Sequence, residues 1–382
     1  MPITAAARYL ALGLMVGLMG ALATTEGRAE DIRIGMPAPV TGPIAYLGQH
    51  MRWAAEMATD EINAAGGVLG GKLSFLMQDT ACRPADSVSA VEKLISQDQV
   101  ALVLGDLCSG ATLALMPIVE RAQKPMIVSI STHPGVTEKA GVGGNKWVFR
   151  TVADDGMMTG VIARTMQKEN PGKLAALGED TDYGRGGITL LGQKLGDKTP
   201  FESQDFVKTS ETDFLPILTR LRSAKPDAIA VFMLDQQLLN LMKQYAQFGL
   251  TAPLVGRPAL VSNLVVDLLA TGKFNNSWTV YPYYDAYDGA ANAAFVTAYK
   301  ARFKEPPHYV AFGIYESIKV AADALQRAGT ADGAKLRDAL AATDYKGILG
   351  PIKFDDHNQA HTNLMLMRVR DGKLSVQELI QG

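Results

Sequence analysis

Short apolar runs typical of β-strands alternate with longer segments of helical periodicity along most of the chain. In the first half, strand-like runs are found at 32–37, 72–78, 100–104, 126–129 and 147–150, and helical segments at 49–64, 87–97 and 111–123. Repeated β-α-β units predict a parallel sheet covered by helices on both faces. The alternation restarts at 173–177, so we expect two α/β halves of similar rhythm.

The C-terminal part departs from this rhythm. Helical segments are predicted at 290–303, 310–328 and 333–341, followed by strands at 352–354, 362–370 and 374–379. Asp371-Gly372 is typical of a tight hairpin turn between the last two strands. We therefore expect the chain to return and cover both halves.

Length and charge restrict the class of protein. The 382 residues, 47% of them hydrophobic, are enough for a large core and favour two domains. The formal net charge is −2, and no basic patch or acidic tail indicates a nucleic-acid partner.

The N-terminus has the pattern of a secretory signal peptide. Arg8 precedes the apolar run Tyr9–Ala23, and Gly27-Arg28-Ala29 offers small residues for cleavage. The run is short for a membrane span. A buried first helix is the alternative, although Gly and Met interrupt any amphipathic face. We predict a signal peptide over 1–29 and an exported mature chain without a membrane span.

Export affects the interpretation of the only two cysteines, Cys82 and Cys108. An oxidising compartment favours a disulfide between them, which would close a loop of about 26 residues. Two buried thiols remain the alternative.

Small polar residues follow two neighbouring predicted strands. The first group is Gly105–Thr112, which includes Ser109, and the second is Ser129–Thr132, which includes Ser131. Both turns lie at the carboxyl edge of a parallel sheet, where open α/β folds bind ligands. The backbone N–H groups at a helix start, helped by the Ser109 hydroxyl, suit an anion such as a carboxylate. Ordinary loops with helix caps are the alternative.

Motifs for catalysis are missing from the sequence. It has no nucleophile elbow, no His-Glu-x-x-His and no phosphate-binding loop. Tyr183–Gly187 is glycine-rich before a helix, but its spacing does not fit a dinucleotide site. His357 and His361 lie in a predicted turn, and His133 in a loop. We expect no enzyme activity, no cofactor and no metal.

Several motifs, in this order behind a signal peptide, resemble one family of solute-binding proteins. They are Asp31–Met36 with Thr41-Gly42-Pro43, Asp60-x-Ile62-Asn63-Ala64-x-Gly66-Gly67, Asp79–Cys82, Leu107–Ser109, Ser131-Thr132, Tyr183-Gly184, Asp213-Phe214 and Gly350–Asp355. Over nearly the whole mature chain, the sequence resembles the branched-chain-amino-acid type of periplasmic binding protein, the receptors of ABC importers.

The resemblance implies two Rossmann-like lobes with parallel sheets, joined by a hinge and closing around a solute. We expect residues 30–151 and 282–352 to form the first lobe, and residues 152–281 and 353–382 the second. It further implies a periplasmic monomer that serves a membrane permease and its ATPase. A ligand sensor of the same fold, including an amide- or urea-responsive one, is an alternative role.

Site residues are also implied by the resemblance. Ser109 and Thr132 would bind a solute carboxylate, together with the neighbouring Ser131, and Ile130 would offer its carbonyl. Tyr183 would close over the solute from the second lobe. Tyr46 is either a flank of the pocket or a surface aromatic.

The chain departs from the amino-acid binders in two loops. Where they place an acid to pair with the solute's ammonium, this chain has Gly256-Arg257-Pro258, and an earlier loop carries Asp235. A buried ammonium needs an anion. Since Arg257 would oppose an ammonium, we hypothesise a carboxylate solute without one: an aromatic, oxo or hydroxy acid, or a short dicarboxylate. An amino acid held by Asp235 is the alternative.

Overall fold

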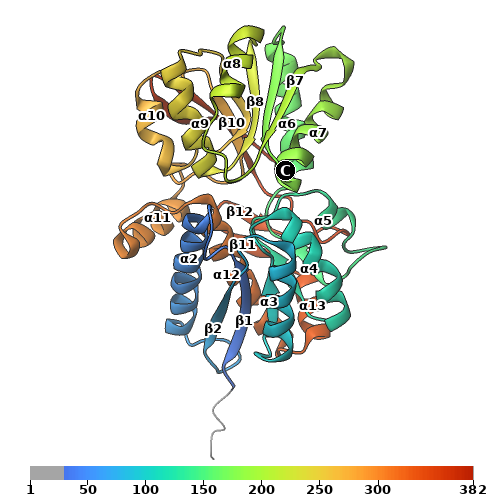
Figure 1. Ribbon diagram of the computed structural model, residues 1–382. Coiled ribbons are helices and arrows are strands. Elements are labelled where there is room, and N and C mark those ends of the chain that lie inside the picture. Colours follow the sequence, from blue (N-terminus) through green and yellow to red (C-terminus); the bar gives the residue numbers. More distant parts are fainter. Residues whose placement is uncertain (1–29, 382) are drawn as a thin grey trace, which may run out of the picture.

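The computed structural model describes residues 30–381, so the predicted signal peptide lies outside the described residues. Two α/β lobes lie one above the other (Figure 1). This confirms the predicted fold class. Over the part of the chain that is described, no helix combines the length and the apolar character needed to cross a membrane.

The first lobe contains a five-stranded parallel sheet in the order β2-β1-β3-β4-β5. Its strands are β1 (Ile32–Ala38), β2 (Leu73–Asp79), β3 (Leu102–Leu104), β4 (Met126–Val128) and β5 (Val148–Arg150). β3, β4 and β5 are buried over their whole length, as is typical of a parallel sheet covered by helices.

Helices from both ends of the chain cover this sheet. From the first part come α2 (Ala45–Ala64), α3 (Pro84–Ser96), α4 (Ser109–Ala122) and the short α5 (Gly135–Glu138). From the last part come α11 (Ala290–Phe303), α12 (Tyr309–Ala328) and α13 (Gly333–Ala341), followed by the small hairpin of β11 (Tyr345–Gly347) and β12 (Gly350–Ile352). α12 packs along α2, so the returning chain completes the first lobe (Figure 1).

The second lobe contains a parallel sheet in the order β7-β6-β8-β9 and an antiparallel extension. Its parallel strands are β6 (Leu174–Glu179), β7 (Phe201–Val207), β8 (Ala228–Met233) and β9 (Leu254–Pro258), and the extension is β10 (Trp278–Tyr281), β13 (Leu364–Arg370) and β14 (Lys373–Ile380). Its helices are α6 (Asp155–Glu169), α7 (Asp182–Leu195), α8 (Leu215–Ala224), α9 (Asp235–Phe248) and α10 (Val266–Ala270), with 3₁₀ turns at Gly196–Lys198 and Asn263–Val265.

The predicted hairpin turn between β13 and β14 is confirmed. Arg370 pairs with Lys373, and both turn residues have positive φ, 48° at Asp371 and 74° at Gly372. A two-residue turn with φ positive at both positions matches the twist of the flanking strands, which explains the Asp-Gly sequence.

The chain passes between the lobes after β5, after β10 and before β13. The third passage lies later than the expected boundary between residues 352 and 353. Arg150 N donates to Asn358 O (2.9 Å), and Ala360 N donates to Arg150 O (2.8 Å), so this segment continues the edge of the first sheet. We therefore place the third passage between Ala360 and Leu364.

Two predicted helix starts are wrong. The glycine-rich segment 183–187 belongs to α7 and is not a loop, because Thr181 caps the helix by accepting from Gly184 N (3.2 Å). Glycine is needed there for close packing: a Cβ at Gly184 would lie 2.1 Å from the carbonyl oxygen of Glu179. The helix predicted to begin at residue 87 begins at Pro84, so Asp86 lies in the first turn of α3.

Candidate solute site

A cavity of about 330 Å³ lies between the lobes, at the carboxyl edges of both parallel sheets. Its first-lobe wall comes mainly from the loops after β1, β2, β3 and β4, and its second-lobe wall from the ends of β6, β8 and β9 and the start of α7. The lining includes Ser109, Ile130, Ser131, Thr132, Tyr183 and Arg257 from the predicted set. The structure thus brings together residues from four separate segments of the sequence.

The start of α4 forms the polar part of the first-lobe wall. Ser109 is the first residue of the helix, and its hydroxyl accepts from the Ser131 hydroxyl (3.2 Å). Nearby in the lining, the buried hydroxyl of Ser129 has no hydrogen-bond partner among the described residues. Unpaired N–H groups at the helix start and these hydroxyls make a surface that suits an anion.

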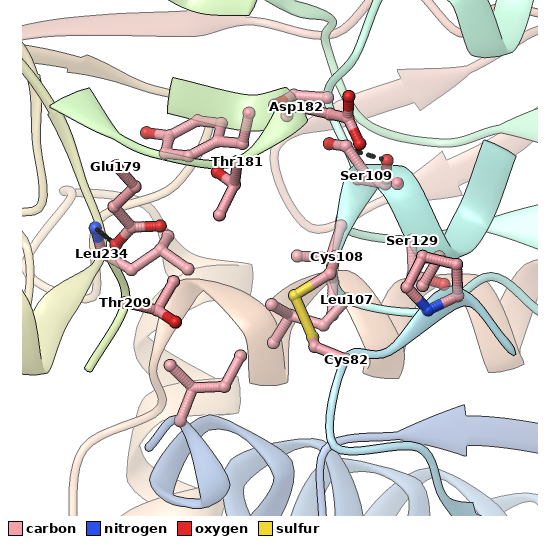
Figure 2. A pocket seen from close by; sticks show the side chains of 18 of the residues that line it. Cys82, Leu107, Cys108, Ser109, Ser129, Glu179, Thr181, Asp182, Thr209 and Leu234 are labelled. Carbon is pink, nitrogen blue, oxygen red and sulfur yellow. Dashed lines mark hydrogen bonds between the residues drawn. A yellow bond between two sulfur atoms is a disulfide. The ribbon is translucent and has the colours of Figure 1, made fainter. Parts of the chain in front are cut away.

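The predicted disulfide between Cys82 and Cys108 is confirmed and joins the loop after β2 to the start of α4 (Figure 2). The buried carboxylate of Asp106 holds the same two loops. It accepts from the hydroxyls of Thr80 (2.7 Å) and Ser87 (2.9 Å) and from Cys108 N (3.1 Å). The two sulfur atoms bond to each other, so this cluster does not provide thiolate ligands for a metal.

The second-lobe wall includes Tyr183, near the start of α7. Its hydroxyl is buried and has no partner in the described structure, and burial raises the pKa of Tyr183 well above its ordinary value. The hydroxyl therefore stays protonated and is available as a hydrogen-bond donor to a solute.

Arg257 is the penultimate residue of β9, not a loop residue as predicted. Its Nη1 donates to Asp155 Oδ1 (3.2 Å), and its guanidinium lies over the Tyr281 ring at 4.5 Å. Burial raises the pKa of Asp155 to about 6, although the neighbouring Arg257 opposes this rise. The pair largely neutralises the charge of Arg257, and its Nε–H is left without a partner within residues 30–381. Arg257 thus offers a donor and not an uncompensated charge.

Glu179, at the end of β6, is a lining residue that the sequence reasoning missed. Only 2% of its surface is exposed, and its Oε1 accepts from Leu234 N (2.8 Å). Burial raises the pKa of Glu179 to about 7. Its position directly after a buried apolar strand was a usable signal, because such residues lie at the ligand-binding edge of a parallel sheet.

Asp235 and Tyr46 do not line the cavity. The Asp235 carboxylate, on the second lobe, is held by His308 Nε2 (2.5 Å) at the start of α12, and both side chains are buried. Tyr46 packs edge-on against His50, with 4.7 Å between ring centroids, and lies 6.0 Å from the His308 ring. These two residues belong to a polar cluster beside the cavity, where the returning helix meets the second lobe.

The remaining histidines of interest lie where a metal is not expected. His361 Nε2 pairs with Asp355 (2.9 Å) in the turn before β13, and His357 Nδ1 lies 3.2 Å from the carbonyl oxygen of Ala140. His133 lies in a loop, as predicted. It is half-buried, and its Nδ1 accepts from Gly135 N (3.0 Å).

Comparison with known proteins identifies the family. A family model described as periplasmic binding protein matches residues 31–373. The chain is 29% identical over 333 residues to the leucine-, isoleucine-, valine-, threonine-, and alanine-binding protein of Pseudomonas aeruginosa, covering 86% of this chain and 87% of that protein.

Two solved structures carry different solutes. A solute binding protein of an ABC transporter from Rhodopseudomonas palustris BisB5, in complex with 3,4-dihydroxybenzoic acid, is 26% identical with a TM-score of 0.81 and covers 92% of this chain and 96% of its own. A branched-chain amino acid transporter substrate binding protein from Streptococcus pneumoniae, in complex with isoleucine, is 25% identical with a TM-score of 0.82 and covers 92% of this chain and 100% of its own.

These matches agree with the expectation of a binding protein that is not an enzyme. The chain belongs to the periplasmic binding protein family, among the solute-binding proteins of branched-chain-amino-acid-type ABC importers.

Proposed function

We propose that this protein captures, in the periplasm, a small carboxylic acid that has no α-ammonium group. Aromatic, oxo and hydroxy acids and short dicarboxylates are the candidate solutes. The closed protein then delivers the solute to the membrane permease and ATPase of its importer.

One observation carries the choice of solute class. Asp235, the acid that would have compensated an ammonium, is already paired with His308 outside the cavity lining. A buried ammonium that cannot reach an anion is strongly disfavoured. The α4 start, with Ser109, offers N–H and hydroxyl groups to a carboxylate, and Arg257 adds an unpaired Nε–H to the wall.

The relatives support both solute classes. The Rhodopseudomonas structure, at 26% identity, holds an aromatic acid, and the Streptococcus structure, at 25% identity, holds isoleucine. An amino acid is therefore the second candidate, favoured by the amino-acid-binding protein of Pseudomonas aeruginosa and by the acidic Glu179 in the lining.

A thermal-shift screen tests the proposal. The mature protein is unfolded and refolded to remove any solute retained from the cell, then melted with amino acids, aromatic carboxylates, oxo acids, dicarboxylates and small amides. A ligand that binds the native state raises the melting temperature by mass action. Shifts with carboxylic acids lacking an ammonium support the proposal, and shifts with amino acids alone overturn it while the family assignment stands.

Export is tested separately on the full-length chain. Expression in a Gram-negative host, followed by osmotic release and intact-mass measurement, should give a periplasmic product that begins at Glu30 or Asp31. A full-length product retained in the cytoplasm would contradict the signal-peptide prediction.

A further inference from the structure

The cavity has two polar ends that belong to different lobes. Figure 2 shows Ser109 and Ser129 on one side, with Glu179 and Leu234 on the other. The wall also contains apolar side chains, among them Leu107, Leu234 and Phe312. A solute that complements this cavity carries an anionic group at the Ser109 end, a second polar group at the Glu179 end, and an apolar body between them.

Glu179, at the end of β6, is the acidic residue at the second-lobe end of the cavity. Its Oε1 accepts from Leu234 N (2.8 Å), and the hydrogen bonds among the described residues leave Oε2 free to face the cavity that Glu179 lines. The charge of Asp235 also acts on Glu179, but the Asp235 carboxylate is paired with His308, whereas Glu179 has no such partner among the described residues. Desolvation, together with the charge of Asp235, raises the pKa of Glu179 to about 7. A solute must therefore offer a hydrogen-bond donor to keep Glu179 ionised in this site.

Three kinds of solute fail this requirement. A purely apolar far end would leave the buried oxygen unpaired. A second carboxylate would face Glu179 with charge of the same sign. An α-ammonium is attached to the carbon next to the carboxylate, so a solute whose carboxylate lies at Ser109 carries its ammonium on the Ser109 side of the cavity, away from the Glu179 side (Figure 2).

We propose that Glu179 is a specificity-determining residue, which accepts a hydrogen bond from a hydroxyl at the far end of an aromatic carboxylic acid. The solute carboxylate lies at the start of α4. This inference rests on the proposed function and narrows it to hydroxy-substituted aromatic acids. A hydrogen bond from a hydroxyl to a carboxylate is among the stronger kinds, and it needs no extra charge in the site.

The test compares 4-hydroxybenzoate with benzoate by titration calorimetry, on wild type and on Glu179→Gln. The matched control is Glu316→Gln. Glu316 is also buried, accepts from a backbone N–H (Ile348, 3.2 Å) and has a pKa raised to about 7. It lines a neighbouring cavity of about 260 Å³ and not the candidate solute cavity. Melting curves of both variants check that they fold.

Wild type should bind 4-hydroxybenzoate about ten- to a hundredfold more tightly than benzoate. Glu179→Gln should bring this ratio close to one, mainly through weaker binding of 4-hydroxybenzoate, and Glu316→Gln should keep it. An equal affinity of wild type for both acids would overturn the role of Glu179 without any variant, and so would an unchanged ratio in Glu179→Gln.

Two further outcomes separate this inference from the proposed function. If 4-(aminomethyl)benzoate binds more tightly than 4-hydroxybenzoate, Glu179 reads an ammonium at the far end, which overturns the hydroxyl inference alone. If wild type binds amino acids and no aromatic acid, both the inference and the proposed solute class are overturned.

Discussion

Removal of the Cys82–Cys108 disulfide should lower the free energy of unfolding by an amount that depends on the length of the loop it closes. The two cysteines are 26 residues apart, and the chain-entropy relation gives a loss of about 3.5 kcal/mol at 25 °C. The unfolding entropy of a domain is about 2.1 cal/mol/K per residue, or roughly 0.7 kcal/mol/K for a mature chain of about 350 residues. Replacement of both cysteines by alanine should therefore lower the melting temperature by about 5 °C.

Solute affinity should respond much less than stability. The Asp106 carboxylate still bridges the loop after β2 and the start of α4 through Thr80, Ser87 and the backbone of Cys108. These hydrogen bonds hold the Ser109 end of the cavity in place without the covalent bond. We expect the affinity of the double variant to fall by less than about tenfold, since no contact to the solute is removed.

Calorimetric melting and titration of the same preparations give both numbers. Dithiothreitol provides the control: it should lower the melting temperature of the wild type and leave that of the double alanine variant unchanged. An unaltered melting temperature in the variant would refute the loop-entropy reasoning. A loss of affinity beyond about a hundredfold would show that the disulfide, and not Asp106, positions the α4 start.

Three further changes test individual contacts. Ser109→Ala should weaken carboxylate binding by roughly 1–3 kcal/mol in calorimetry, because an anion loses a charge-assisted partner, and an unchanged affinity would remove Ser109 from the site. Burial raises the pKa of Asp235, but His308, together with hydrogen bonds from Ser262 and the backbone, lowers it, so the net pKa is below its ordinary value. The stability of this pair is present above the unfolded pKa of about 4 and is lost as pH falls through the lower folded pKa. Melting curves of wild type and Asp235→Asn should therefore converge toward acid pH, and a constant gap would contradict this. Gly110→Ala places a Cβ 2.3 Å from Asp182 Oδ2 across the cleft, so solute affinity should fall severalfold and recover when Asp182→Ala is added. Failure of that recovery would show that the clash is not with Asp182.

Arg257 lines the cavity as predicted, but its surroundings differ from those expected. From its sequence neighbours it was expected to be a loop cation that opposes an ammonium. The structure places it at the end of β9, beside Asp155, more than a hundred residues earlier in the chain. Asp155 lies where the chain first enters the second lobe, far from β9 in the sequence. No local sequence pattern indicates that these two residues pair.

The sequence by itself determined the features that depend on local physics. The alternation of strand-like and helical segments specifies the α/β class, and Asp371-Gly372 specifies a hairpin because its backbone tolerates positive φ. Two cysteines in a chain with a predicted export signal were enough to predict the disulfide. Ser109 and Thr132 were predicted because polar residues that follow parallel strands meet at one edge of the sheet.

Only the tertiary structure decided which charged groups are left to meet a solute. Asp235 is paired with His308 at the start of the returning α12, whereas the hydrogen bonds of the described chain leave Oε2 of Glu179 free. Ion pairs and desolvation act through space and join residues of distant sequence position. For that reason the sequence predicts where the cavity lies, but the pairing of its acids and bases is settled only when both lobes and the returning helices pack together.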